Sequence, residues 1–202
     1  MRIMHVIGLI IHPQKEWQKI RLESTSIPRI YLTYIFLLAA IPILCNYIGT
    51  TQIGWYFNPD KVIRLSSDNA ATIAIMGYLA LLGGVFVVGL LIHQLSQTYS
   101  ASTSLAQCVV FSAYTATPLF VLGIAGLYPA IWVYLIAGII AAAYTTYLLY
   151  AGLPIVMNIP KEQGFFFASS ILCVGLVAFV SLLVIAVLLL ATGIGPGVNL
   201  LL

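Results

Sequence analysis

The sequence predicts an all-α integral membrane protein with five transmembrane helices preceded by a short amphipathic interfacial helical segment. Three observations support this prediction. Only 6% of the residues are Asp, Glu, Lys or Arg, whereas a water-soluble domain has about a quarter. None of these residue types occurs from Asn69 to Pro160, or from Gln163 to Leu202. The apolar residues also gather in blocks of about 20, the length of helix that crosses a hydrocarbon core.

Five apolar blocks are the predicted spans. They cover approximately residues 30–48, 70–92, 105–126, 129–152 and 165–191. Each block is expected to be a helix, because lipid offers no hydrogen-bond partner to an open backbone N–H or C=O group. Runs such as Ser181 to Ala191 lack the alternation of polar and apolar residues that a membrane β-barrel requires. Residues 30–202 are therefore predicted to form one membrane domain, with no soluble domain.

Residues 1–29 are predicted to form a cytoplasmic amphipathic segment. Its apolar residues recur at the spacing of one helical face, at Ile3, Val6, Ile7, Ile10 and Ile11. Pro13 then begins a second short helix, in which Trp17 and Ile20 share a face. A Trp with basic flanks suits the headgroup region, so the segment is expected to lie flat on the inner leaflet. The alternative, a cleaved signal peptide, would need a small-residue cleavage site, and none follows this short apolar run.

The basic residues predict the orientation of the chain. Five of the eight Lys and Arg residues precede the first span: Arg2, Lys15, Lys19, Arg21 and Arg29. A cytoplasmic N-terminus places these five and Lys161 inside, six in all, against Lys61 and Arg64 outside. With five spans, the C-terminus is then periplasmic or extracellular. The net charge of +3 is explained by this asymmetry, and no nucleic-acid partner is expected.

The third and fourth spans contain a cluster of tyrosines and threonines around one proline. Pro118 has no N–H group, so the carbonyl of Tyr114 loses its helical partner and the third span should kink. Tyr114 and Tyr144 lie at matching depth, roughly 12–14 Å from the inner ends of their helices. One hypothesis is a polar groove open to the cytoplasm and lined by Tyr114, Thr117, Pro118, Tyr144, Tyr147 and Tyr150. The alternative is ordinary packing, because hydroxyl groups in membranes commonly hydrogen-bond between helices.

Residues for catalysis or metal binding do not form recognisable patterns. His5, His12 and His93 have no accompanying pattern of carboxylates or cysteines, so no metal site is expected. There is no Gly-x-Ser-x-Gly motif, no acid within the spans to orient a histidine, and no Gly-rich phosphate loop. No catalytic residue and no cofactor are predicted, and the chain is not expected to be an enzyme.

Three segments together resemble a known family. They are "HPQKEWQKI" (His12 to Ile20), "AYTATP" (Ala113 to Pro118) and "YAGLPIVMNIP" (Tyr150 to Pro160). Their order and spacing, over nearly the whole chain, are similar to the YohC-like bacterial inner-membrane branch of the Yip (Ypt/Rab-interacting protein) family. The resemblance implies a five-helix protein of the bacterial inner (plasma) membrane with a cytoplasmic N-terminus. The positions most similar to the family's shared ones include Trp17, Gly152, Met157 and Pro160, beside Tyr114 and Pro118.

The same resemblance informs the choice of partner. Eukaryotic relatives are linked to Rab GTPases and vesicle traffic. Their acidic-aromatic Gly-Pro motif before the first span is missing here, so a GTPase partner is not expected.

Two functions remain as hypotheses. The first is a non-enzymatic inner-membrane protein that organises or scaffolds the membrane or partner proteins. Its partners would be the lipid bilayer, other membrane proteins or a second copy of the chain. The alternative is an uncoupled transporter, channel or lipid pathway for a small neutral or lipid-like solute, using the polar groove. Ion-coupled transport is disfavoured, because no acid or base lies deep in a span.

Overall fold

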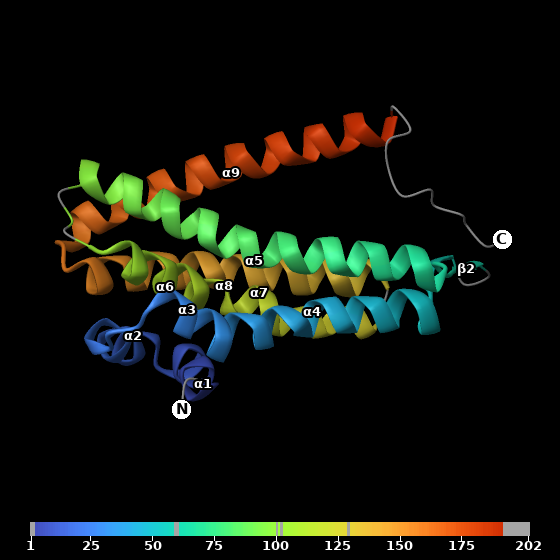
Figure 1. Ribbon diagram of the computed structural model, residues 1–202, viewed down its shortest axis with the longest axis horizontal. Coiled ribbons are helices and arrows are strands. Elements are labelled where there is room, and N and C mark those ends of the chain that lie inside the picture. Colours follow the sequence, from blue (N-terminus) through green and yellow to red (C-terminus); the bar gives the residue numbers. More distant parts are fainter. Residues whose placement is uncertain (1–2, 59–60, 100, 102, 129, 192–202) are drawn as a thin grey trace.

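Five long helices lie side by side in the computed structural model, which describes residues 3–58, 61–99, 101, 103–128 and 130–191 (Figure 1). All five are long and apolar enough to cross a membrane. The five predicted blocks fall on these helices, although the fourth helix begins at Ile131, two residues later than predicted. The all-α membrane fold is thereby confirmed.

The elements follow one another with short connections. In chain order they are α1 (Ile3–Ile11), α2 (Pro13–Leu22), α3 (Ile27–Ile30), the π-helix η1 (Tyr31–Ile35), α4 (Phe36–Ile48), the π-helix η2 (Gly49–Ile53), β1 (Trp55–Asn58), β2 (Lys61–Ile63), α5 (Ser67–Thr98), α6 (Leu105–Thr115), α7 (Thr117–Leu122), the 3₁₀-helix η3 (Gly123–Leu127), α8 (Ile131–Met157) and α9 (Lys161–Ala191). The first span is continuous from α3 to η2, and the third consists of α6, α7 and η3.

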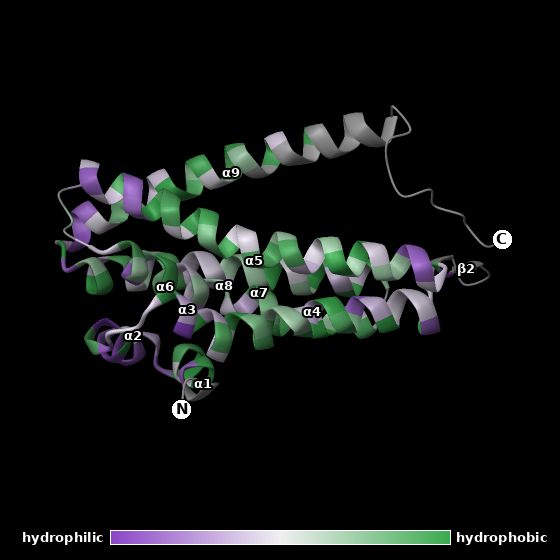
Figure 2. Ribbon diagram, in the orientation of Figure 1, coloured by the Kyte–Doolittle hydropathy of each residue, from purple (hydrophilic) through white to green (hydrophobic). Residues whose placement is uncertain are grey.

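The two ends of the bundle differ. One end, called the N-terminal end below, contains α1, α2 and the connections from α5 to α6 and from α8 to α9 (Figure 1). The other end contains a small antiparallel hairpin of β1 and β2, with Trp55 opposite Ile63. The sequence did not predict this hairpin. Hydrophilic residues concentrate at the two ends, while the middle of the helices is mostly hydrophobic (Figure 2), as a membrane-spanning bundle requires.

The third span is broken where the sequence predicted a kink. α6 ends at Thr115 and α7 begins at Thr117, with Pro118 in its first turn. The hydroxyl of Thr117 donates a hydrogen bond of 2.6 Å to the carbonyl of Tyr114. Pro118 has no N–H to donate to the Tyr114 carbonyl, so the Thr117 hydroxyl takes the place of the usual helical donor.

The buried core lies toward the N-terminal end. Its largest fully buried side chains include Trp17, Tyr34, Phe111, Tyr114, Leu153 and Phe167, contributed by α2, η1, α6, α8 and α9. Farther along, one helix leaves the bundle. α9 diverges from α5 and α8 toward its C-terminal end (Figure 1), and a Cβ atom added at Gly175 would meet nothing within 4 Å.

The N-terminal segment is docked on this core. α2 packs against α8, and Trp17 and Ile20 are 0% and 4% exposed. The expectation that the Trp17 side chain lies among lipid headgroups is therefore wrong, because protein covers it. α1 differs, since its Ile7, Ile10 and Ile11 side chains face outward. At its last turn, the carbonyls of Leu9 and Ile10 accept hydrogen bonds from the hydroxyl of Tyr144, the middle residue of α8.

Candidate functional site

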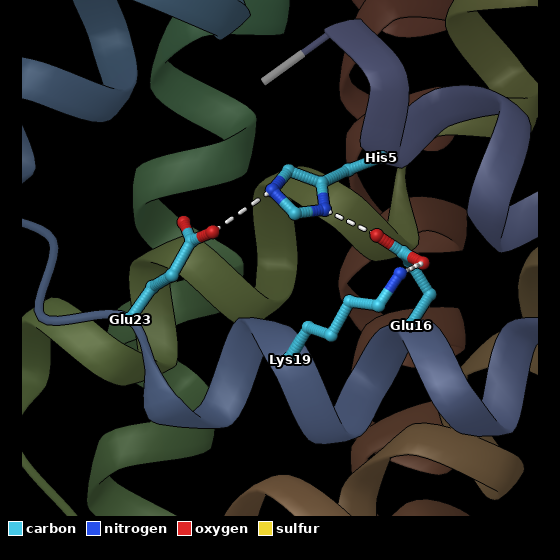
Figure 3. Close-up of polar contacts among 4 residues, drawn as sticks. All are labelled: His5, Glu16, Lys19 and Glu23. Atoms are coloured by element: carbon cyan, nitrogen blue, oxygen red, sulfur yellow. Dashed lines mark hydrogen bonds and ion pairs between the residues drawn. The ribbon is translucent and has the colours of Figure 1, made fainter. Parts of the chain in front are cut away.

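His5 lies between the carboxylates of Glu16 and Glu23, which are 11 and 18 positions away in the sequence (Figure 3). Its Nδ1 is 2.5 Å from Oε1 of Glu16, and its Nε2 is 3.1 Å from Oε1 of Glu23. Lys19 donates from Nζ to Oε2 of Glu16 over 3.0 Å. His5 and Glu16 are 8% and 6% exposed, so this pair is buried between α1 and α2, while the Lys19 and Glu23 side chains reach the surface. We call His5, Glu16, Lys19 and Glu23 the histidine cluster.

Both carboxylate oxygens of Glu16 have a hydrogen-bond partner in the histidine cluster. Oε1 faces Nδ1 of His5, and Oε2 accepts from Nζ of Lys19. These partners compensate for the burial of the carboxylate. Burial by itself would raise the pKa of Glu16, but the hydrogen bonds from His5 and Lys19 outweigh it and the pKa is lowered.

A line of aromatic and hydroxyl groups continues from His5 into the bundle. The rings of His5 and Tyr114 meet edge to face at 5.5 Å, and those of Tyr114 and Tyr34 are 4.6 Å apart. The Tyr34 hydroxyl is 2.7 Å from Oγ1 of Thr117, which donates to the carbonyl of Tyr114 as described above. This line connects α1 with the first and third spans, and Tyr34 and Tyr114 are almost completely buried.

A second anchor joins α2 to α8. The indole of Trp17 lies so close to Gly152 that a Cβ atom there would be 2.5 Å from Cε2 of Trp17 and 2.8 Å from Cε2 of Phe111. Only glycine allows this approach. The rings of Trp17 and Phe111 are 4.9 Å apart. Trp17 and Gly152, both singled out by the family resemblance, therefore meet directly although they lie far apart in the sequence.

The other two motif residues flank the turn from α8 to α9. Met157 is buried at the last position of α8, and Asn158 caps that helix with a left-handed φ of 55°. Asn tolerates this conformation better than most residues. The carbonyl of Pro160 accepts a 2.9 Å hydrogen bond from the Gly164 N–H in the first turn of α9. Met157 and Pro160 thus help to shape the connection between the last two spans.

The six residues of the predicted polar groove do not surround one groove. Tyr114, Thr117 and Pro118 lie together in the buried core. The Tyr144 hydroxyl donates to the carbonyls of Leu9 and Ile10, at 2.9 and 3.0 Å. Tyr150 pairs with Ser169 of α9 at 2.9 Å, and the Tyr147 side chain is 47% exposed. The hydroxyls of Thr117, Tyr144 and Tyr150 hydrogen-bond to other elements.

The histidine cluster and Tyr34 were missed by the sequence analysis. The sequence shows no pattern of carboxylates around His5, and Glu16 is 11 positions away. The turn at His12 folds α2 back along α1, and only this fold brings Glu16 and Glu23 to the imidazole. The one signal available was the amphipathic pairing of two short helices, which does not specify their relative placement. Among the described residues, no three His, Cys, Asp or Glu are arranged to hold a metal ion.

Comparison with known proteins extends over almost the whole chain. The profile of the Yip1 domain matches residues 7–195. Inner membrane protein YohC of Escherichia coli strain K12 is 42% identical over 189 residues, which cover 94% of this chain and 97% of the relative. The protein of the same description from Escherichia coli O6:H1 strain CFT073 gives the same figures. No solved structure matches this chain.

Proposed function

This multi-pass inner-membrane protein belongs to the Yip1 domain family, and we propose that it is a non-enzymatic scaffold that organises the membrane or partner proteins. In this proposal the α1–α2 pair and the five spans act as one rigid body. Partners or lipids bind to its outward surfaces, and nothing passes through its interior.

The observation that best supports the proposal is the filled interior at the N-terminal end. Tyr34, Phe111 and Tyr114 occupy the space between the spans and are at most 1% exposed. A solute path at this end would have to displace these aromatic rings, the Tyr34–Thr117 hydrogen bond and the anchor between Trp17 and Gly152. Close packing of this kind favours a rigid body over a conduit.

The outer surfaces support the same proposal. In the most apolar windows of α5 and α8, only 17% and 11% of the residues are buried within the chain. α8 alone presents Ile136, Ile139 and Ile140 to the outside, each more than half exposed. Helices with this much free apolar surface can bind lipid, other membrane helices or a second copy of the chain.

We also propose that the N-terminal end faces the cytoplasm. Lys15, Lys19, Arg21 and Lys161 lie at that end, whereas Lys61 and Arg64 lie at the hairpin end. The positive-inside rule favours this orientation. A reporter that is active only outside the cytoplasm, fused to the C-terminus, should be active. An inactive C-terminal reporter together with an active N-terminal one would reverse the assignment.

Site-specific photo-crosslinking in native membranes tests the scaffold. A photo-reactive residue at Ile139, which is 68% exposed, should form discrete protein adducts. The same residue at Leu148, which is on α8 but fully buried, is the matched control and should form none. The competing function is tested in liposomes that contain the purified protein. Solute flux or lipid scrambling well above protein-free liposomes, with no discrete adduct at Ile139, would replace the scaffold by a transport function.

A further inference from the structure

A cavity opens at the N-terminal end where α2, α8 and α9 meet. Its volume is about 560 Å³, within the range of small-ligand sites. Polar groups come from α2 and α9, and apolar groups mainly from α8. The lining residues are Gln14, Gln18, Tyr150, Ala151, Pro154, Ile155, Ile159, Lys161 and Phe165. The cavity is separate from the histidine cluster, and we call it the α2–α8–α9 cavity.

The polar side of the α2–α8–α9 cavity is positively charged. Lys161 is the one charged residue in its lining, and the neighbouring Glu162 does not line it. Gln14 and Gln18 are one helical turn apart on α2, so both amides face the cavity from the same side. Among the described residues, Gln14, Gln18 and Lys161 have no hydrogen-bond or ion-pair partner. Three unused donor groups around one cavity suit an anionic, oxygen-rich ligand.

The cavity lies near the ends of α8 and α9, the part of a membrane-spanning bundle that meets lipid headgroups. Lys161 is the first residue of α9, and Tyr150 is seven residues before the end of α8, or roughly 10 Å along the helix. Lys and Tyr at helix ends are typical of the membrane interface. A ligand in this position has its polar part at the helix ends and its remaining part toward the hydrocarbon.

An apolar strip on α8 continues from the cavity toward the middle of the bundle. Beyond Ala151, the residues at helical spacing on the same face are Tyr147, Ala143, Ile140 and Ile136. All four are exposed, and those with large side chains are between 47% and 57% exposed. An acyl chain can lie along this strip while its headgroup occupies the cavity.

We propose that the α2–α8–α9 cavity binds the phosphate-bearing headgroup of an acidic phospholipid, with an acyl chain along the exposed strip of α8. Lys161 pairs with the phosphate, and Gln14 and Gln18 donate to the phosphate and glycerol oxygens. Basic pockets between spans recognise acidic headgroups in this way. The proposal does not depend on a protein partner, so failure of the scaffold test leaves it standing.

Native mass spectrometry of the purified full-length chain tests the proposal. The protein is delipidated in detergent and titrated with phosphatidylglycerol or with phosphatidylcholine. Wild type should retain one phosphatidylglycerol per chain in preference to phosphatidylcholine. Lys161→Gln should bind phosphatidylglycerol about tenfold more weakly, since one charge-assisted contact is lost. Lys15→Gln removes the same charge from α2 outside the cavity lining and should bind as wild type does.

A second variant separates loss of the site from loss of the fold. Ala151→Phe fills the cavity from an outward position of α8 and should abolish the retained lipid while the melting temperature stays close to that of wild type. Equal weakening by Lys161→Gln and Lys15→Gln would overturn the proposal, because the attraction would then be general surface charge. Equal retention of phosphatidylcholine, or displacement of the lipid by millimolar glycerol phosphate, would also overturn it.

Discussion

At the scale of single residues, the contact between Trp17 and Gly152 fixes how α2 sits on the spans. Trp17 is 0% exposed, and there is no room for a Cβ atom at Gly152. The family resemblance singled out both residues, but it could not show that they touch. A fully buried indole against a glycine is a packing constraint that appears only when the helices are placed.

Replacement of Gly152 should therefore destabilise the protein. Gly152→Ala places a methyl group against Trp17 and Phe111, and overpacking of this kind costs about 1–3 kcal/mol. Gly138→Ala is the matched control, because Gly138 is on the same helix and a Cβ atom there meets nothing within 4 Å. Thermal unfolding in detergent should show a lower melting temperature for Gly152→Ala only. Equal melting temperatures for the two variants would refute the tight contact.

The lowered pKa of Glu16 predicts how the stability of the protein depends on pH. Its pKa is lowered from the ordinary value of 4.5, so the stability that it contributes is present in full above about pH 4.5. That stability is lost as the pH falls through the lower pKa of the folded state. The residues facing Glu16 that titrate or carry charge are His5 and Lys19, and Glu23 faces His5 from its other side. Glu16→Gln should lower the melting temperature at pH 6 and flatten its dependence on pH below 4.5.

The control for this prediction is Glu162→Gln, because Glu162 is exposed at the start of α9. Melting temperatures of wild type and both variants, measured from pH 3.5 to 7, provide the comparison. A Glu16→Gln curve parallel to that of wild type throughout would mean that Glu16 contributes no pH-dependent stability.

At the scale of elements, the break between α6 and α7 is stabilised by hydroxyl groups. Thr117 donates to the carbonyl of Tyr114 and pairs with the Tyr34 hydroxyl of the first span. Thr117→Val removes a hydrogen-bond partner from each of these two buried groups, and the loss of a buried partner costs about 1–3 kcal/mol. The melting temperature should fall clearly, whereas Thr72→Val, at an exposed threonine that also bonds to its own helix, should change it little. A Thr117→Val protein as stable as wild type would show that the break needs no side-chain support.

Elements were predictable from the sequence wherever one local cause determined them. Lipid solvation determines helix length, so the five spans agree with the apolar blocks, and the missing N–H of Pro118 determines the break in the third span. Contacts between elements were not predictable in the same way. Tyr144 was predicted on the fourth span, where α8 has it, yet its partner is the end of α1, 134 and 135 positions away. No spacing within the sequence encodes such a pairing.

At the scale of the whole molecule, the α1–α2 pair and the spans form one packed unit. The histidine cluster holds α1 to α2, Trp17 holds α2 to α8, and the Tyr114–Tyr34 line connects His5 to the first and third spans. This arrangement differs from a peripheral helix that lies freely on the lipid surface. It also gives the proposed scaffold a defined shape at its N-terminal end, beside the cavity proposed to bind lipid.

Hydrogen exchange of α2 tests this central claim most directly. In wild-type protein reconstituted in nanodiscs, the amides of residues 14–22 should exchange as slowly as those of the adjoining end of α8. In Gly152→Leu, the new side chain occupies the space that the Trp17 indole fills. Exchange of the α2 amides should become much faster, while exchange of the α5 amides is unchanged. Gly138→Leu should leave both helices as they are in wild type. If α2 exchanged equally in wild type and Gly152→Leu, the helix would be held by lipid rather than by the bundle, and the account of a single packed unit would be contradicted.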